Sequence, residues 1–129
     1  MAEASANGTF EVTLTPVSAP DAPVGALSIA KTFHGDLDGS SAGQMLAVRS
    51  IVEGSAGYVA MERVTGAIAG RSGSFALQHS GSMERGVQSL WVTVVPDSGT
   101  GDLVGLSGAM DIRIEDGRHL YAFRYSLPD

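Results

Sequence analysis

The chain of 129 residues contains no cysteine, which excludes disulfide bonds, thiolate metal sites and thiol catalysis. Charged residues are also scarce, at 17% of the chain, too few to favour a disordered polypeptide. No apolar run approaches the roughly 20 residues that a membrane-spanning helix needs. No basic region followed by an apolar run, as in a signal peptide, is present near the amino terminus. We therefore expect a cytoplasmic protein with no membrane partner.

Positive charge is especially limited. The chain has 8 lysines and arginines against 14 aspartates and glutamates, for a net charge of −6. A protein that binds nucleic acid usually carries a basic stripe to neutralise phosphates, and none is visible here. Nucleic acid and anionic membrane surfaces are therefore excluded as expected partners.

What the sequence does contain is apolar residues and glycine. Hydrophobic residues make up 43% of the chain, enough for a core, and there are 17 glycines, which suit turns, bulges and tight bends. The length is that of one domain. We expect a loose, flexible tail over Met1–Gly8, followed by a single domain over residues 9–129.

Alternating apolar and polar residues predict eight β-strands, and no segment sustains a helical period. The predicted strands are Thr9–Thr15, Ala26–Leu37, Gly43–Glu53, Tyr58–Ile68, Ser74–His79, Val87–Val95, Leu103–Glu115 and Arg118–Leu127. The dipeptides Asp38-Gly39 and Asp116-Gly117 are typical of tight turns. Short turns favour pairing in sequence order, so we expect an all-β, closed, eight-stranded antiparallel up-and-down barrel. An open sandwich is the alternative.

The alternation also assigns side chains to the interior. In the fourth predicted strand Glu62 shares the inner face with Tyr58, and in the neighbouring strand His79 shares it with Phe75 and Leu77. A carboxylate inside an apolar barrel is costly unless it is paired or hydrogen-bonded. We therefore expect Glu62 and His79 to face one interior, as the pair that moves a proton or fixes the polar end of a ligand. A buried Glu that is merely satisfied by its neighbours is the structural alternative.

The aromatic and aliphatic residues of the inner face are the expected lining of a ligand cavity. An eight-stranded barrel is just wide enough to be filled by side chains or to hold one small ligand. Lys31 interrupts the apolar face of the second strand, so a bulge or a side chain reaching out to water is expected there. The predicted ligand-binding residues are Phe33, Tyr58, Phe75, Leu77, Tyr121 and Phe123.

Other patterns are weaker. His34, Asp36 and Asp38 alternate at a strand end, but such spacing is common by chance, and neither a metal nor a cofactor is predicted. Gly99-Thr100-Gly101 lacks the helix and the lysine of a phosphate loop. Some apolar residues remain for the outer face, which favours a homo-oligomer. These residues are Val59, Met61, Ile68 and Trp91.

Several segments carry a resemblance to a known family. They are F-H-G-D-L at 33–37, Y-V-A-M-E-R-V-T-G at 58–66, G-R-S-G-S-F-A-L-Q-H at 70–79 and V-V-P-D-S-G-T-G-D-L at 94–103. Together they resemble a family of small uncharacterised bacterial proteins, a domain of unknown function, which is similar to the allene oxide cyclase-type barrel. The resemblance implies an eight-stranded barrel whose apolar cavity, as in plant allene oxide cyclases and some cofactor-free cyclases, folds a reactive substrate. The plant cyclase's own site motif and its cysteine are missing here.

Three functions follow as hypotheses. In the first, the barrel binds a small and mostly apolar molecule, with Glu62 and His79 at its polar end. In the second, the same cavity belongs to a cofactor-free isomerase or cyclase that holds its substrate in a reactive geometry. In the third, the interior is filled and the barrel is a structural, oligomer-forming protein. Binding ranks first and catalysis second, and whether the protein is an enzyme stays open.

Overall fold

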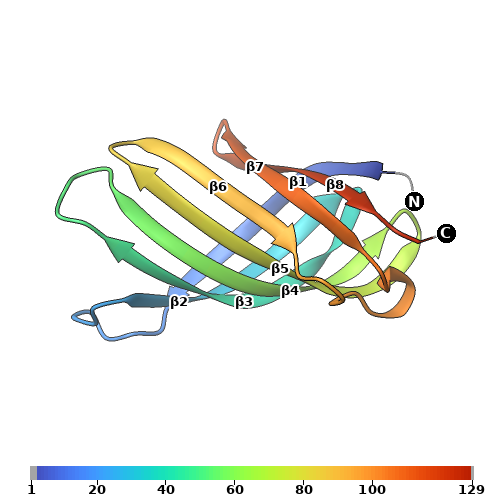
Figure 1. Cartoon of the computed structure of the whole chain (residues 1–129), viewed down its shortest axis with the longest axis horizontal. Helices are drawn as coiled ribbons and strands as arrows, with labels where there is room; N and C mark the ends of the chain where they lie inside the picture. The colour runs from blue at the N-terminus through green and yellow to red at the C-terminus, as the bar shows by residue number, and fades with distance from the viewer. Residues whose placement is uncertain (1–2, 129) are drawn as a thin grey trace.

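The computed structural model describes residues 3–128, and these form a closed barrel of eight antiparallel strands (Figure 1). Each strand pairs with the next in sequence, and β1 closes the ring by pairing with β8. The elements are β1 (Glu3–Pro16), β2 (Gly25–Gly35), β3 (Leu37–Arg49), β4 (Ala56–Ile68), β5 (Arg71–Glu84), β6 (Val87–Val94), the 3-10 helix η1 (Gly101–Leu103), β7 (Ser107–Glu115) and β8 (Arg118–Ser126). The predicted all-β barrel is therefore confirmed. No helix within residues 3–128 is long and apolar enough to cross a membrane.

Tight two-residue turns connect several of the strands. Asp116 and Gly117 have φ angles of 52° and 77°, as the predicted turn requires. Ala69-Gly70 and Arg85-Gly86 also have positive φ at both positions. Two successive positive φ angles define the type I′ turn, whose twist matches that of paired strands. Local turn chemistry thus fixes three of the hairpins.

The turn predicted at Asp38-Gly39 is wrong, because both residues belong to β3 and Gly39 pairs with Phe33 of β2. The chain turns earlier, at Gly35, where φ is 103°. The Tyr121 hydroxyl braces this turn: it accepts a hydrogen bond from the Leu37 amide at 2.9 Å and donates to a backbone carbonyl at 2.8 Å. A side chain from β8 therefore sets the position of the β2–β3 turn. Because the chain turns earlier than predicted, the third strand spans residues 37–49 instead of 43–53.

The expected loose tail differs from the structure over residues 3–8, which form the first half of β1 and pair with β8. Met1 and Ala2 lie outside the described residues. In this segment small residues oppose large ones, with Ala6 against Phe123 and Gly8 against Tyr121. A Cβ added to Gly8 would lie 2.6 Å from the Tyr121 hydroxyl. The first half of β1 therefore contributes only small residues to the core, and the large side chains beside it belong to β8. This is why its sequence shows no apolar alternation.

The interior has two different halves. Around the braced β2–β3 turn it is filled: the rings of Phe75 and Phe123 stack at 6.0 Å, and Phe33 meets Tyr121 edge-on at 5.7 Å. Leu103 and Leu106, from the connection between β6 and β7, are buried in the same core. Side chains thus pack one half of the barrel, and the other half is the place where a cavity can form.

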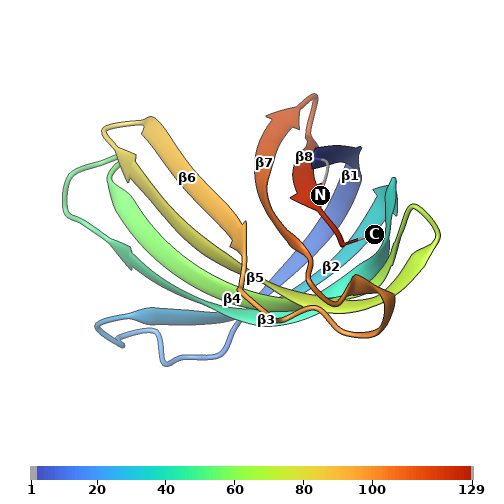
Figure 2. The ribbon, with the colours of Figure 1, turned by 45° about the vertical axis from the view of Figure 1, so that its right-hand side comes forward.

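The barrel wall is weakest between β6 and β7. Within residues 3–128 these strands pair only through Thr93 and Ala109. Figure 2 shows them diverging on one side of that point, whereas β1 and β8 pair along the whole segment from Glu3 to Phe10. One edge of β6 and one edge of β7 therefore lack a paired strand over most of their length. We call this place the seam.

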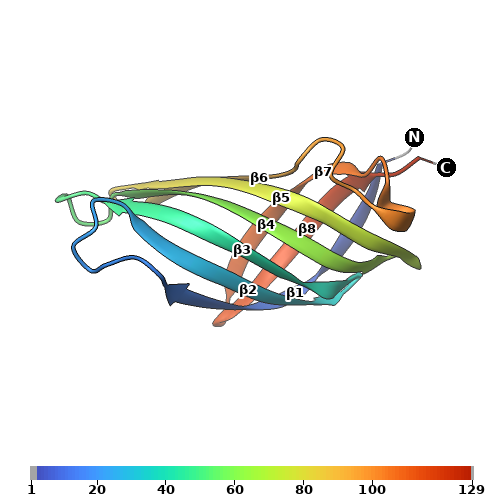
Figure 3. The same ribbon diagram turned by 90° about the horizontal axis from the view of Figure 1, so that it is seen from below.

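The outer face carries some of the expected apolar residues. Val59, Met61 and Trp91 are exposed, Trp91 by 72%. Ile68 was expected with them and is buried instead, at 1% exposure. It lies an even number of residues from Glu62, so the pleat of β4 carries its side chain inward. Figure 3 views the wall formed by β2 to β6 from outside. The homo-oligomer stays a prediction.

Candidate functional site

A charged cluster lies inside the barrel around Glu62. The side chain of Glu62 is fully buried, and its two oxygens have three partners. Oε2 lies 2.6 Å from Nε2 of His79 and accepts a hydrogen bond from Nζ of Lys31 at 2.8 Å. Oε1 accepts a hydrogen bond from the Ser41 hydroxyl at 2.7 Å. Every partner is itself buried, so the carboxylate is fully enclosed by groups that stabilise its charge.

The strand register explains why these four residues meet. They come from the four consecutive strands β2 to β5, and each belongs to the inward-facing set of its strand. Glu62 is paired with Leu77, and His79 lies two residues further along the same face of β5. Diagonal neighbours of this kind are within reach of long side chains.

Gly43 allows Lys31 and Glu62 to meet across β3. It pairs with Glu62 and lies between β2 and β4, so an inward side chain here would stand between the lysine and the glutamate. A Cβ built on Gly43 would be 2.6 Å from the Glu62 Cα, closer than atoms tolerate. A glycine is therefore required at this point for close strand packing as well as for the ion pair.

Glu62 is ionised in this environment. Burial by itself would raise the pKa of the carboxyl, but the hydrogen bond from His79 and the charge and hydrogen bond of Lys31 outweigh it, with Ser41 adding to them, and lower the pKa to about 2. Tyr58, on the same face of β4, has its pKa raised by burial and by the negative charge of Glu62. At neutral pH Glu62 is thus an anion and Tyr58 keeps its proton.

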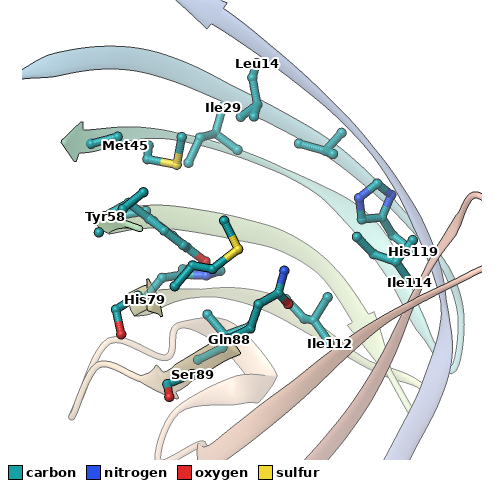
Figure 4. A pocket seen from close by; sticks show the side chains of 18 of the residues that line it. Leu14, Ile29, Met45, Tyr58, His79, Gln88, Ser89, Ile112, Ile114 and His119 are labelled. Carbon is teal, nitrogen blue, oxygen red and sulfur yellow. The ribbon is translucent and has the colours of Figure 1, made fainter. Parts of the chain in front are cut away.

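A cavity of about 880 Å³ occupies the other half of the barrel. Lys31 and His79 line it, and Lys31 also lies over the Phe10 ring, 4.8 Å from its centre. The charged cluster therefore forms the floor between the packed core and the cavity. Figure 4 shows the surrounding side chains, which come from strands on opposite sides of the barrel. Those labelled are Leu14, Ile29, Met45, Tyr58, His79, Gln88, Ser89, Ile112, Ile114 and His119.

The cavity also reaches the seam. Gln88, Ser89 and Leu90 line it in succession on β6, and residues 112–114 do the same on β7. Both strands of the seam therefore contribute residues to the wall of the cavity.

The residues predicted from the sequence separate into two groups. Glu62 and His79 face one interior and touch each other, and Tyr58 lines the cavity. The other expected ligand-binding residues face inward but belong to the packed core: Phe33, Phe75, Leu77, Tyr121 and Phe123. None of these five lines the cavity. Alternation identifies which side chains of a strand face the interior. It does not show which part of the interior is packed with side chains and which part is a cavity.

Lys31 and Ser41 are the members of the cluster that the sequence reasoning missed. The expected bulge at Lys31 is absent, since β1 and β2 pair in unbroken register through Val12 and Lys31. The lysine does not reach out to water either, because its ammonium group binds Glu62. A signal for this ion pair was present in the sequence. The inner face of β2 has one basic residue, Lys31, and the inner face of β4, two strands away, has one acidic residue, Glu62.

The ring of His79 has one nitrogen left for a ligand. Nε2 is taken by Glu62, while Nδ1 has no hydrogen-bond partner within residues 3–128. No enclosed side-chain nitrogen or oxygen in the same range lacks a partner, so Nδ1 is open to the cavity. A neutral imidazole that donates through Nε2 offers a lone pair at Nδ1. His79, held by Glu62, can therefore accept a proton or a hydrogen bond from a bound molecule at Nδ1.

No group of three or more metal-binding side chains is found in the part of the chain that the structure describes. His34, from the weak metal pattern, instead pairs on the outer surface with Glu11 at 2.9 Å.

Comparison with known proteins identifies the family. The model of a family described as "Protein of unknown function (DUF3224)" matches residues 6–125. The chain belongs to the DUF3224 family. A DUF3224 family protein of unknown function from Shewanella oneidensis MR-1, solved by crystallography, is 44% identical, with 99% of each chain covered and a TM-score of 0.94. A comparison with curated proteins finds no match. The expected bacterial family of unknown function is confirmed, and its similarity to allene oxide cyclase barrels stays a prediction.

Proposed function

We propose that this DUF3224 protein binds a small, mostly apolar molecule in the hollow half of its barrel. The observation that carries the proposal is the position of the buried cluster of Lys31, Glu62 and His79 at the floor of a largely apolar cavity. A volume of about 880 Å³ is within the range of small-molecule sites, which combine apolar walls with a few fixed polar groups. The apolar body would lie among the walls and the polar end on the floor.

The cost of the cluster supports the same proposal. Replacing a buried ion pair by packed apolar residues is often neutral or stabilising, so a buried pair is weak evidence for a purely structural role. Here most of the remaining inner face is apolar, and the charged cluster lies at the boundary between the packed core and the cavity. A polar floor under an apolar cavity is what orientation of a ligand requires.

Native mass spectrometry of the freshly purified protein tests this proposal first, because one spectrum reports co-purified molecules and the number of subunits. Binding of the neutral fluorescent dye Nile red gives a second measurement that needs no natural ligand. The matched variants are Ala47→Phe, which fills the cavity, and Leu46→Phe, on the outer face of the same strand. We expect dye binding to the wild type and to Leu46→Phe, and a severalfold loss in Ala47→Phe. Equal binding by the two variants, or no binding by the wild type, contradicts the proposal.

Catalysis without a cofactor is the second candidate, and the contact of 2.6 Å between His79 and Glu62 favours it. With Nδ1 open to the cavity, His79 would accept a proton from a bound molecule and return it at another atom, while the Glu62 carboxylate stabilises the imidazolium. Incubating a co-purified ligand with the protein in heavy water would then place deuterium on the ligand. The His79→Gln variant should show none. A ligand that binds but gains no deuterium leaves the protein a binding protein.

A further inference from the structure

The charges around the cavity are of one sign. Three of the 8 lysines and arginines of the chain line it, together with His79 and His119. No aspartate or glutamate among residues 3–128 lines it, although the chain holds 14. Lys31 is buried at the floor, whereas Arg49 and Arg113 are exposed and mark the rim. Although the protein is acidic overall, the charged side chains that line this cavity within residues 3–128 are all basic.

Glu62 does not reverse this pattern. Its side chain is enclosed, and both oxygens are occupied by Lys31, His79 and Ser41. A cationic head group entering the cavity would find no free carboxylate oxygen to bind. The lysine ammonium has three donor hydrogens and gives one to Glu62, so it has donors left for an acceptor in the cavity.

The basic residues of the rim are exposed to water, unlike Lys31 at the floor. Arg113 pairs with Glu115 at 3.2 Å, and both side chains are largely exposed, so the pair is screened by water. The floor is where an ionic contact counts most, because a charge interacts more strongly in an enclosed apolar space. The head group of a ligand is therefore selected mainly by Lys31, and the Tyr58 hydroxyl, which lines the same cavity, is a second donor.

We propose that the ligand is an organic anion: an apolar body that ends in a carboxylate or a similar oxyanion, with the oxyanion against the ammonium group of Lys31. This inference rests on the proposed binding function and adds the class of the head group. The oxyanion accepts hydrogen bonds from the ammonium, and the apolar body extends toward the cavity wall formed by Met45, Ile112 and Ile114.

The test compares three ten-carbon probes with the same body and different heads: decanoate, 1-decanol and decylammonium. Each displaces Nile red from the wild-type protein at pH 7. We expect decanoate to bind roughly tenfold or more tightly than 1-decanol, since a hydrogen bond to a charged group is worth at least that ratio. Decylammonium should bind most weakly. Equal affinities for decanoate and 1-decanol, or a preference for decylammonium, overturn the head-group assignment and leave the binding function in place.

A double variant locates the preference. Lys31→Met combined with Glu62→Gln removes both charges, so that no unpaired charge stays buried. In this variant the affinity for decanoate should fall close to that for 1-decanol. The matched control is Arg63→Met, which removes one positive charge from the exposed face of β4 and should keep the preference. An unchanged preference in the double variant overturns the role of Lys31. If that variant does not fold, the wild-type probe series decides alone, and a wild type that binds neither dye nor probe refutes the binding function as well.

Discussion

At the scale of single residues, Glu62 is the group on which the interior depends. Lys31, Ser41 and His79 all bind it, and Gly43 leaves the space in which the ion pair forms. Removing one partner of a buried pair leaves the other charge without compensation, which commonly costs about 3–5 kcal/mol. The Lys31→Met single variant should therefore be much less stable than the double variant with Glu62→Gln. Urea unfolding at neutral pH measures the difference, and equal stabilities would show that the pair is solvated.

Acid should weaken the fold through the same carboxyl. Its pKa is about 2 in the folded protein, below the ordinary value of 4.5, so the stabilising effect is complete above about pH 4.5 and is lost as the pH falls toward 2. The stability difference between wild type and Glu62→Gln should shrink over this window. Urea unfolding at several pH values measures it. The control is Glu11→Gln, which removes one member of the exposed pair with His34 and should change the stability little. A constant difference for Glu62→Gln would contradict this linkage.

At the scale of elements, the strands differ in how firmly they are held. β4 and β5 pair with each other along the whole of β4, whereas β6 and β7 pair with each other only at Thr93 and Ala109 within the described chain. Amide hydrogens that point into an unpaired edge are open to water and exchange quickly. We expect faster hydrogen exchange at alternate amides of residues 87–91 and 111–115 than in β4. Uniform protection around the barrel would show that the seam is closed in solution, and bound ligand should slow exchange at these edges.

The sequence was informative where structure depends on a short stretch of chain. The period of two placed Glu62 and His79 inside, and the Asp116-Gly117 turn needed no distant partner. It was uninformative where the partner is remote. The pairing of Lys31 depends on a strand two positions away, the β2–β3 turn depends on Tyr121, and residues 3–8 take their core from β8. Whether an inward side chain meets a packed core or a cavity depends on all eight strands at once.

At the scale of the whole molecule, the packed core and the cavity occupy different halves of the barrel. Phe75 is fully buried in the packed half, and Met45 lines the cavity. Phe75→Ala should cost about 3–5 kcal/mol of unfolding free energy, as large-to-small changes in a core do, and should change Nile red affinity little. Met45→Ala should cost far less stability and should alter the affinity. Thermal unfolding and dye titration of both variants measure this division. If both variants lose stability and affinity in the same proportion, the two halves are not separate.

The seam has a further consequence for the path of the chain. The first strand, β1, and the last strand, β8, lie side by side, with Glu3 opposite Ser126. The first and last strands are therefore firmly paired with each other, whereas the seam falls between β6 and β7, two strands that are neighbours in sequence. Consider a circularly permuted chain that begins at β7, connects β8 directly to β1 and ends at β6. Such a chain would pass through all eight strands in order, from one side of the seam to the other. Its ends in sequence would then coincide with the edges of its sheet.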